Sequence, residues 1–132
     1  MKEVVLIDSH VFIWALFEPN RLSQAAKDAL LAAAEVRVSL ASFWELSLKY
    51  RKGKLAYSPE LLSGELVKLG ADWLNITPDH IEQSASILTS HLDPFDQMIV
   101  TQSISEKMTL ITGDSEILKL KSPGLKLIDC RG

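Results

Sequence analysis

Cysteine is nearly absent from this sequence, and long apolar runs are absent altogether. Cys130 is the single cysteine among 132 residues, which excludes an intrachain disulfide and fits a reducing compartment. No apolar run approaches the roughly 20 residues that a membrane-spanning helix needs. The opening MKEVVLIDSH is not a signal peptide, because its short apolar run ends at Asp8. We therefore expect a cytoplasmic protein that makes no contact with a membrane.

An excess of positive charge is also lacking. The chain has 14 Lys and Arg against 17 Asp and Glu, a formal net charge of −3. This balance argues against a broad basic face for nucleic acid, but it leaves room for a local basic patch. Apolar residues make up 47% of the chain, enough for a hydrophobic core and too many for disorder. From the length we expect one domain over residues 1–132.

Short apolar segments alternate with helical patterns along the chain. Residues 4–7 (VVLI) are typical of a strand covered on both faces of a parallel sheet. Ser23, Pro59 and Gly70 mark helix ends. The expected strands are residues 4–7, 36–40, 73–76, 109–112 and 125–129, and the expected helices are residues 9–17, 22–35, 42–50, 58–69, 77–89, 93–107 and 115–119. This order predicts an α/β protein, a three-layer α/β/α sandwich around a mostly parallel sheet.

Acidic residues follow several of the expected strands. Asp8 ends the first strand, Asp114 lies two residues past strand 109–112, and Glu45 lies one turn into the helix after the second strand. Ligands of such sheets bind beyond the carboxyl ends of the strands. Asp93 and Asp96 begin the helix that leads into strand 109–112. Simple alternation would place these two at the wrong end of that helix, unless the preceding helix returns the chain across the sheet.

Each acid also has a purely structural explanation. Asp8, Asp93 and Asp114 are suitable N-caps, and Asp96 would sit in a first helical turn, where the helix dipole favours an acid. Ser42 and Glu45 match the capping box S/T-x-x-E, and Glu45 is spaced to pair with Lys49. Taken singly, each structural explanation is the more common one.

Taken together, the acids favour a cation site. Four or five carboxylates at one edge of a sheet would repel each other at neutral pH, and a cation would hold them ionised and close together. A donor set of oxygens alone favours Mg²⁺ or Mn²⁺ over zinc. Such a site suits phosphoryl chemistry, in which the metal activates water and orients a phosphate.

At these residues the sequence resembles the PIN-domain proteins, specifically VapC-type toxins of type II toxin–antitoxin systems. The resemblance covers nearly the whole chain. It rests on four segments in the family's order and spacing: VLIDSHVFIWAL, SLASFWELSLKYRKGKL, LDPFDQMIVTQS and LITGD. A PIN-like fold is what the resemblance implies.

The resemblance also implies an activity and a set of site residues. The family's four acids fall on Asp8, Glu45, Asp96 and Asp114, which would bind Mg²⁺ or Mn²⁺ and serve catalysis. The supporting residues would be Asp93, Ser9 and Thr112, with Asp93 either a ligand or only a helix cap. The implied function is a Mg²⁺-dependent endoribonuclease toxin that cleaves structured RNA, tRNA or rRNA, through metal-activated water.

The resemblance implies partners as well. A cognate antitoxin would silence the enzyme by laying its C-terminal tail over the active site, and the common assembly is a homodimer. Many relatives carry Arg directly after the third acid, where this chain has Gln97. One possible phosphate contact is therefore missing, and the substrate preference follows less directly than the chemistry.

A basic segment lies beside Glu45. KYRKGK (49–54) would allow Lys49, Arg51, Lys52 and Lys54 to follow an RNA backbone. A solvated helix end explains the same cations equally well. His10 adjoins the site in sequence, but we expect its side chain to point away from it.

Other enzyme classes of similar fold fit less well. A HAD-like phosphatase needs a second aspartate where this chain has His10, and no G-x-G-x-x-G follows the first strand as a dinucleotide site would require. A receiver domain would need an acid pair that is missing. The remaining alternative is a non-catalytic PIN-like module that binds RNA or protein, and the complete acid set argues against it.

Overall fold

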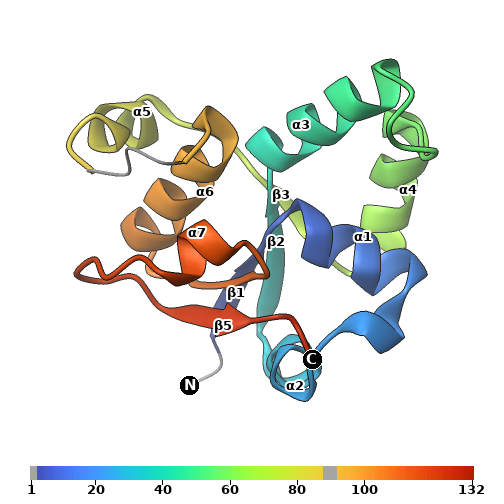
Figure 1. Cartoon of the computed structure of the whole chain (residues 1–132), viewed down its shortest axis with the longest axis horizontal. Coiled ribbons are helices and arrows are strands. Elements are labelled where there is room, and N and C mark those ends of the chain that lie inside the picture. Colours follow the sequence, from blue (N-terminus) through green and yellow to red (C-terminus); the bar gives the residue numbers. More distant parts are fainter. Residues whose placement is uncertain (1–2, 88–91) are drawn as a thin grey trace.

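The computed structural model describes residues 3–87 and 92–132, and Figure 1 shows a central sheet with helices on both sides. The strands pair in the order β3-β2-β1-β4-β5, and every pairing is parallel. The strands are β1 (Val4–Ile7), β2 (Glu35–Ser39), β3 (Asp72–Leu74), β4 (Thr109–Thr112) and β5 (Leu127–Asp129). The strand order reverses at β1, which lies between β2 and β4. A ligand site is therefore expected beyond the carboxyl end of β1.

Helices cover both faces of this sheet. They are α1 (Ser9–Phe17), α2 (Gln24–Ala32), α3 (Leu40–Arg51), α4 (Pro59–Leu69), α5 (Pro78–Ser84), α6 (Pro94–Ser105) and α7 (Ser115–Leu118), with a 3-10 turn at Pro19–Arg21. In Figure 1, α1, α3 and α4 lie on one side of the strands, and α5, α6 and α7 on the other. The predicted α/β/α sandwich is confirmed, and its sheet is entirely parallel. None of the helices in the described residues is long and apolar enough to cross a bilayer.

The sheet separates two apolar layers, because side chains alternate along each strand. In β1, Val5 and Ile7 belong to one buried cluster and Leu6 to the other. The first cluster includes buried residues of α1, α2, α3 and α4, and the second includes residues of α6 and α7. Both faces of β1 are thus apolar, which fixes its central place and leaves only its carboxyl end for polar chemistry.

Most helices begin where the sequence predicts, with small shifts at the ends. Ser23 accepts a hydrogen bond from the Ala26 amide and caps α2, and Gly70 ends α4 in a left-handed conformation with φ of 78°. The predicted capping box of Ser42 and Glu45 does not form, so that prediction is wrong. Helix α3 begins two residues earlier, because the Ser39 hydroxyl accepts the Ala41 amide at 3.0 Å and caps the helix directly after β2.

Helices α5 and α6 form an antiparallel pair that carries the chain back to the carboxyl edge of the sheet. His80 of α5 lies 2.8 Å from Glu106, just beyond the end of α6. At the other end, the Gln97 side chain donates to the Ser84 carbonyl at 3.1 Å. The α5 helix ends at Ser84, and residues 88–89 of the predicted helix 77–89 lie outside the described residues.

This pairing corrects the expectation that simple alternation misplaces Asp93 and Asp96. A helix that precedes a parallel strand runs antiparallel to it and therefore begins at the carboxyl edge of the sheet. Asp93 caps α6 by accepting the Asp96 amide at 2.8 Å, and both acids lie at that edge, near Asp8.

The core beneath this edge should be sensitive to truncation. Leu110 of β4 is fully buried against α6 and α7, whereas Leu31 of α2 is 87% exposed. We expect Leu110→Ala to lower the free energy of unfolding by about 2–5 kcal/mol in urea denaturation. Leu31→Ala is the control and should change it by about 0.5 kcal/mol or less. Equal losses in the two variants would contradict the assignment of the core.

Candidate active site

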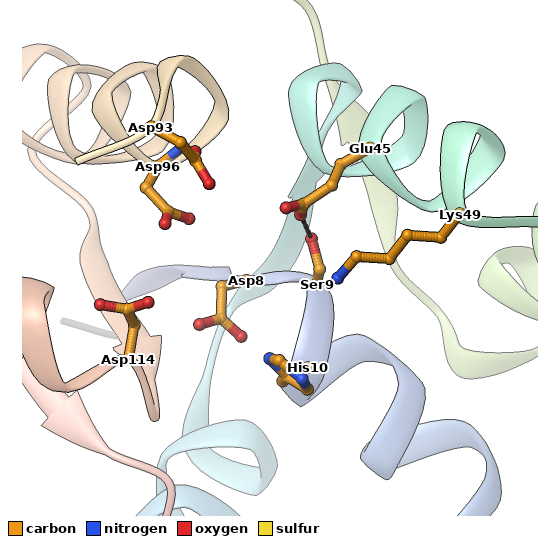
Figure 2. Close-up of a pocket in the computed structure, with 8 residues that line it drawn as sticks. All are labelled: Asp8, Ser9, His10, Glu45, Lys49, Asp93, Asp96 and Asp114. Carbon is orange, nitrogen blue, oxygen red and sulfur yellow. Dashed lines mark hydrogen bonds between the residues drawn. The ribbon is translucent and has the colours of Figure 1, made fainter. Parts of the chain in front are cut away.

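A polar pocket of about 210 Å³ lies at the carboxyl edge of the sheet, where β1, β4, α3 and α6 meet. Figure 2 shows its side chains converging from these separate segments. Five carboxylates line it, together with one hydroxyl, one imidazole and one ammonium group: Asp8, Glu45, Asp93, Asp96, Asp114, Ser9, His10 and Lys49. The structure thus brings together all four acids that the sequence analysis selected, and Asp93 with them.

Asp8 is the most buried of these acids, because it directly follows the central strand. One carboxylate oxygen accepts the Val11 amide at 2.9 Å and so caps α1, and the other accepts a hydrogen bond from the Thr112 hydroxyl. Burial raises the pKa of the Asp8 carboxyl, and the bonds from Thr112 and Val11 oppose that rise. The side chain is therefore fixed in place by helix α1, through Val11, and by strand β4, through Thr112.

Asp93 and Asp114 also cap helices, and each uses one oxygen to do so. The Oδ1 atom of Asp114 accepts the amides of Glu116 and Ile117, at 2.9 and 3.0 Å. Asp93 accepts its amide bond on Oδ1 as well. These capping bonds leave the Oδ2 atoms of both residues for other partners. Capping and pocket lining are therefore compatible roles for the same carboxylate.

Glu45 is positioned by the first helix of the chain rather than by its own. Its Oε1 atom accepts a hydrogen bond from the Ser9 hydroxyl at 2.6 Å, drawn as a dashed line in Figure 2. Lys49 lies one turn further along α3 and also lines the pocket. Among the ion pairs of residues 3–87 and 92–132, none joins Glu45 to Lys49, so the alternative of a simple helix-surface pair is wrong.

The pKa of Asp96 reflects both its burial and the negative charge around it. Burial and the neighbouring carboxylates raise its pKa from the ordinary 3.8 to about 7. Burial is the largest cause, and the charges that add to it, in decreasing order, are those of Asp93, Asp114, Glu45 and Asp8. An acid whose pKa is raised by burial and by four neighbouring carboxylates is a strong candidate for neutralisation by a cation.

His10 lines the pocket, so the expectation that its side chain points away is wrong. Figure 2 shows its ring beside Asp8. The physical reason is that side chains on a helix tilt toward its N-terminus, and His10 is in the first turn of α1. This tilt is the signal that could have identified His10 from the sequence.

The basic segment divides into two parts. Lys49, Lys52 and Lys54 line a second pocket adjoining the first, whereas Arg51 lines neither pocket. The Gln97 side chain is bound to the Ser84 carbonyl, so it does not supply the phosphate contact that an arginine would make there.

The donor set of the pocket suits a hard cation, since its acids offer oxygen atoms alone. As the side chains stand, no three His, Cys, Asp or Glu residues in the described part of the chain could hold a metal ion between them. A shared ion would therefore be held partly through water or after side-chain rotation. Mg²⁺ accepts such an arrangement, because it keeps several of its own waters when it binds.

Comparisons with known proteins identify the family and the fold. The model of the PIN domain family matches residues 5–122. Ribonuclease VapC22 of Mycobacterium tuberculosis is 30% identical over 121 residues, which are 90% of this chain and 93% of that protein.

Solved structures share the fold. VapBC2 of Rickettsia felis, bound to a promoter DNA fragment, superposes with a TM-score of 0.70 at 16% identity and covers 96% of this chain and 98% of its own. DNA-bound VapBC of Salmonella typhimurium gives 0.69 at 17% identity and covers 98% of both chains. At these identities the structural likeness concerns the fold alone.

The crowding of acids should be measurable as a pH-dependent cost to stability. The folded pKa of Asp96 lies above its ordinary value, so its contribution to stability is fully present below about pH 4 and is lost as the pH rises through about 7. Asn carries no charge at any pH. In EDTA, Asp96→Asn should therefore be more stable than the parent by about 1–2 kcal/mol near pH 8, after allowing for solvent screening, and the gain should vanish near pH 4.

Urea denaturation over this pH range checks that expectation. Asp28→Asn, at an exposed acid on α2, is the control for the change in charge and should show no such trend. A stability difference at Asp96 that does not vary with pH would contradict the account of the pocket.

Proposed function

The chain belongs to the PIN domain family, and from this premise we propose that it is a metal-dependent endoribonuclease, the toxin of a type II toxin–antitoxin pair. The observation that supports the proposal most is the pocket of five carboxylates, in which burial and the neighbouring like charges raise the pKa of Asp96 to about 7. The 30% identity to Ribonuclease VapC22 across nine-tenths of the chain supports the same reaction class.

We assign roles according to how each acid is held. Asp8, Asp96 and Asp114 would bind Mg²⁺ or Mn²⁺, and Glu45 would bind it directly or through water. The bound ion would supply an activated water and would neutralise charge that develops on the phosphate. Hydrolysis in this way leaves 5′-phosphate and 3′-hydroxyl ends.

Three neighbouring residues would preorganise these acids. The Thr112 hydroxyl and the Val11 amide hold both oxygens of Asp8, and the Ser9 hydroxyl holds Glu45. Asp93 would act as the cap of α6 and as an added negative charge. The pocket would thus keep its shape before substrate arrives, which is what a hydrolytic site requires.

Partners follow from the same premise. A substrate of structured RNA, tRNA or rRNA, would place its scissile phosphate at the acids, with Lys49, Lys52 and Lys54 on its backbone.

A cognate antitoxin would lay its C-terminal tail over the pocket, and a basic side chain in that tail would suit the five carboxylates. We propose a homodimer as the working unit. A small upstream reading frame that encodes a DNA-binding protein would support the toxin role.

The test is cleavage of a mixed RNA pool by the purified chain with Mg²⁺ or Mn²⁺. We expect Asp8→Asn to reduce the rate by roughly 100-fold or more, because several kcal/mol of transition-state stabilisation depend on the ion that Asp8 would hold. Asp28→Asn makes the same change of charge outside the pocket and should cleave like the parent.

Either of two results would overturn the nuclease assignment. One is a parent chain that stays inert with both ions, and the other is an Asp8→Asn variant that cuts as fast as the parent. RNA binding without cleavage in the first case would identify the chain as a non-catalytic binding module.

A further inference from the structure

A second pocket, of about 230 Å³, opens directly beside the acidic one. The two share Glu45, Lys49 and Asp93, so they form one continuous depression between α3 and α6. Away from the shared residues, the lining of the second pocket changes in character. It consists of two lysines and two apolar side chains: Lys52, Lys54, Leu48 and Phe95.

Phe95 lies between Asp93, the cap of α6, and Asp96 in the sequence, and its side chain is half-buried. Its ring meets that of Trp44 almost at right angles, at 78° and a centroid distance of 5.4 Å. Trp44 precedes Glu45 on α3 and is 61% exposed, unusually open for the largest side chain in proteins. The aromatic pair therefore connects the two helices that carry Glu45 and Asp96, and it does so at the surface of the molecule.

The lysines of this pocket are available to bind an anion. Lys49, Lys52 and Lys54 take part in none of the ion pairs found among residues 3–87 and 92–132. Three acids line only the first pocket (Asp8, Asp96 and Asp114) and two lysines line only the second (Lys52 and Lys54), so the lining becomes more positive along the depression. A polyanion could place one phosphate at the acids, by way of a metal ion, and the next at the lysines.

An aromatic ring beside a row of lysines is the arrangement that binds single-stranded nucleic acid, in which bases stack and phosphates meet cations. We propose that the second pocket holds the unpaired nucleotide next to the scissile phosphate, with its base stacked on Phe95 and its phosphate at Lys52 and Lys54. This inference rests on the proposed nuclease function and deepens it. It makes Phe95 a residue that determines specificity, with Trp44 fixing the orientation of its ring.

The proposal predicts an energetic coupling between Phe95 and one base of the RNA. The probe is a labelled single-stranded RNA oligonucleotide that the parent chain cleaves, together with copies that carry an abasic site at each position in turn. Phe95→Leu keeps an apolar contact for Trp44 but removes the aromatic face. On the intact RNA it should reduce kcat/KM by at least about fivefold, the lower end of base–aromatic stacking.

The abasic series locates the stacked base. For the parent chain, the abasic site adjacent to the cleaved bond should reduce kcat/KM by a similar factor. The same abasic site should reduce the kcat/KM of the Phe95→Leu variant little further, because the aromatic ring on which the base would stack is already absent. A second variant, Lys52→Ala with Lys54→Ala, should weaken cleavage of intact and abasic RNA alike.

Controls separate stacking from a structural effect. Phe17→Leu makes the same side-chain change in the opposite layer, where Phe17 stacks on Tyr57 at 3.9 Å, and it should leave the dependence on the abasic site unchanged. Lys121→Ala removes an exposed lysine that lines neither pocket. Circular dichroism confirms that each variant is folded at the assay temperature.

The two levels of the proposal fail in different ways. A parent chain that cleaves no RNA overturns the nuclease function. The second pocket is then tested by binding of the intact oligonucleotide, measured by fluorescence anisotropy. Phe95→Leu must weaken this binding, and Phe17→Leu must leave it unchanged. If the parent cleaves but the effects of Phe95→Leu and the abasic site simply multiply, the stacking site is wrong. A lower molar mass of Phe95→Leu in light scattering would also overturn it and would identify the aromatic pair as an interface between subunits.

Discussion

Repulsion among carboxylates is the constraint on which the site depends. Five of them line one pocket, and burial together with the charges of its neighbours raises the pKa of Asp96 to about 7. The fold tolerates this crowding because most of these acids also stabilise the start of a helix. Asp8, Asp93 and Asp114 each cap a helix, a bond that stabilises by about 1 kcal/mol. The structural explanation and the proposed functional one are therefore compatible, because capping occupies one oxygen in Asp93 and Asp114 and leaves the second for another partner.

The sequence predicts the sheet well, because its strands are defined by local signals. Strands 4–7 and 109–112 have the bounds expected, since continuous β-branched and aliphatic residues fit a strand buried on both faces. The last strand starts at Leu127, two residues later than expected. Asp8, Glu45 and Asp114 could be grouped from sequence because each follows a strand whose carboxyl end lies at one edge.

Other features depend on contacts that a linear pattern does not contain. Two hydroxyls compete to cap α3, and Ser39 does so because β2 runs directly into that helix. The return of the chain through α5 depends on the contact between His80 and Glu106, which are 26 residues apart. Glu45 bonds to Ser9 across 36 residues. Helices α3 and α6 each contribute an acid to the first pocket, and Phe95 of α6, which lines the second pocket, packs against Trp44 of α3. This juxtaposition is visible only once the helices pack.

The most direct test of the central claim is the binding of Mn²⁺ to the metal-free chain, followed by paramagnetic broadening of backbone amide signals in NMR spectra. Because relaxation falls steeply with distance from the ion, the broadened signals locate it. The account predicts saturable binding that first broadens the amides of Ser9, Asp96 and Gly113, which come from three separate segments that meet at the pocket. Broadening scattered over unrelated acidic surfaces, or no saturable broadening at all, would contradict it.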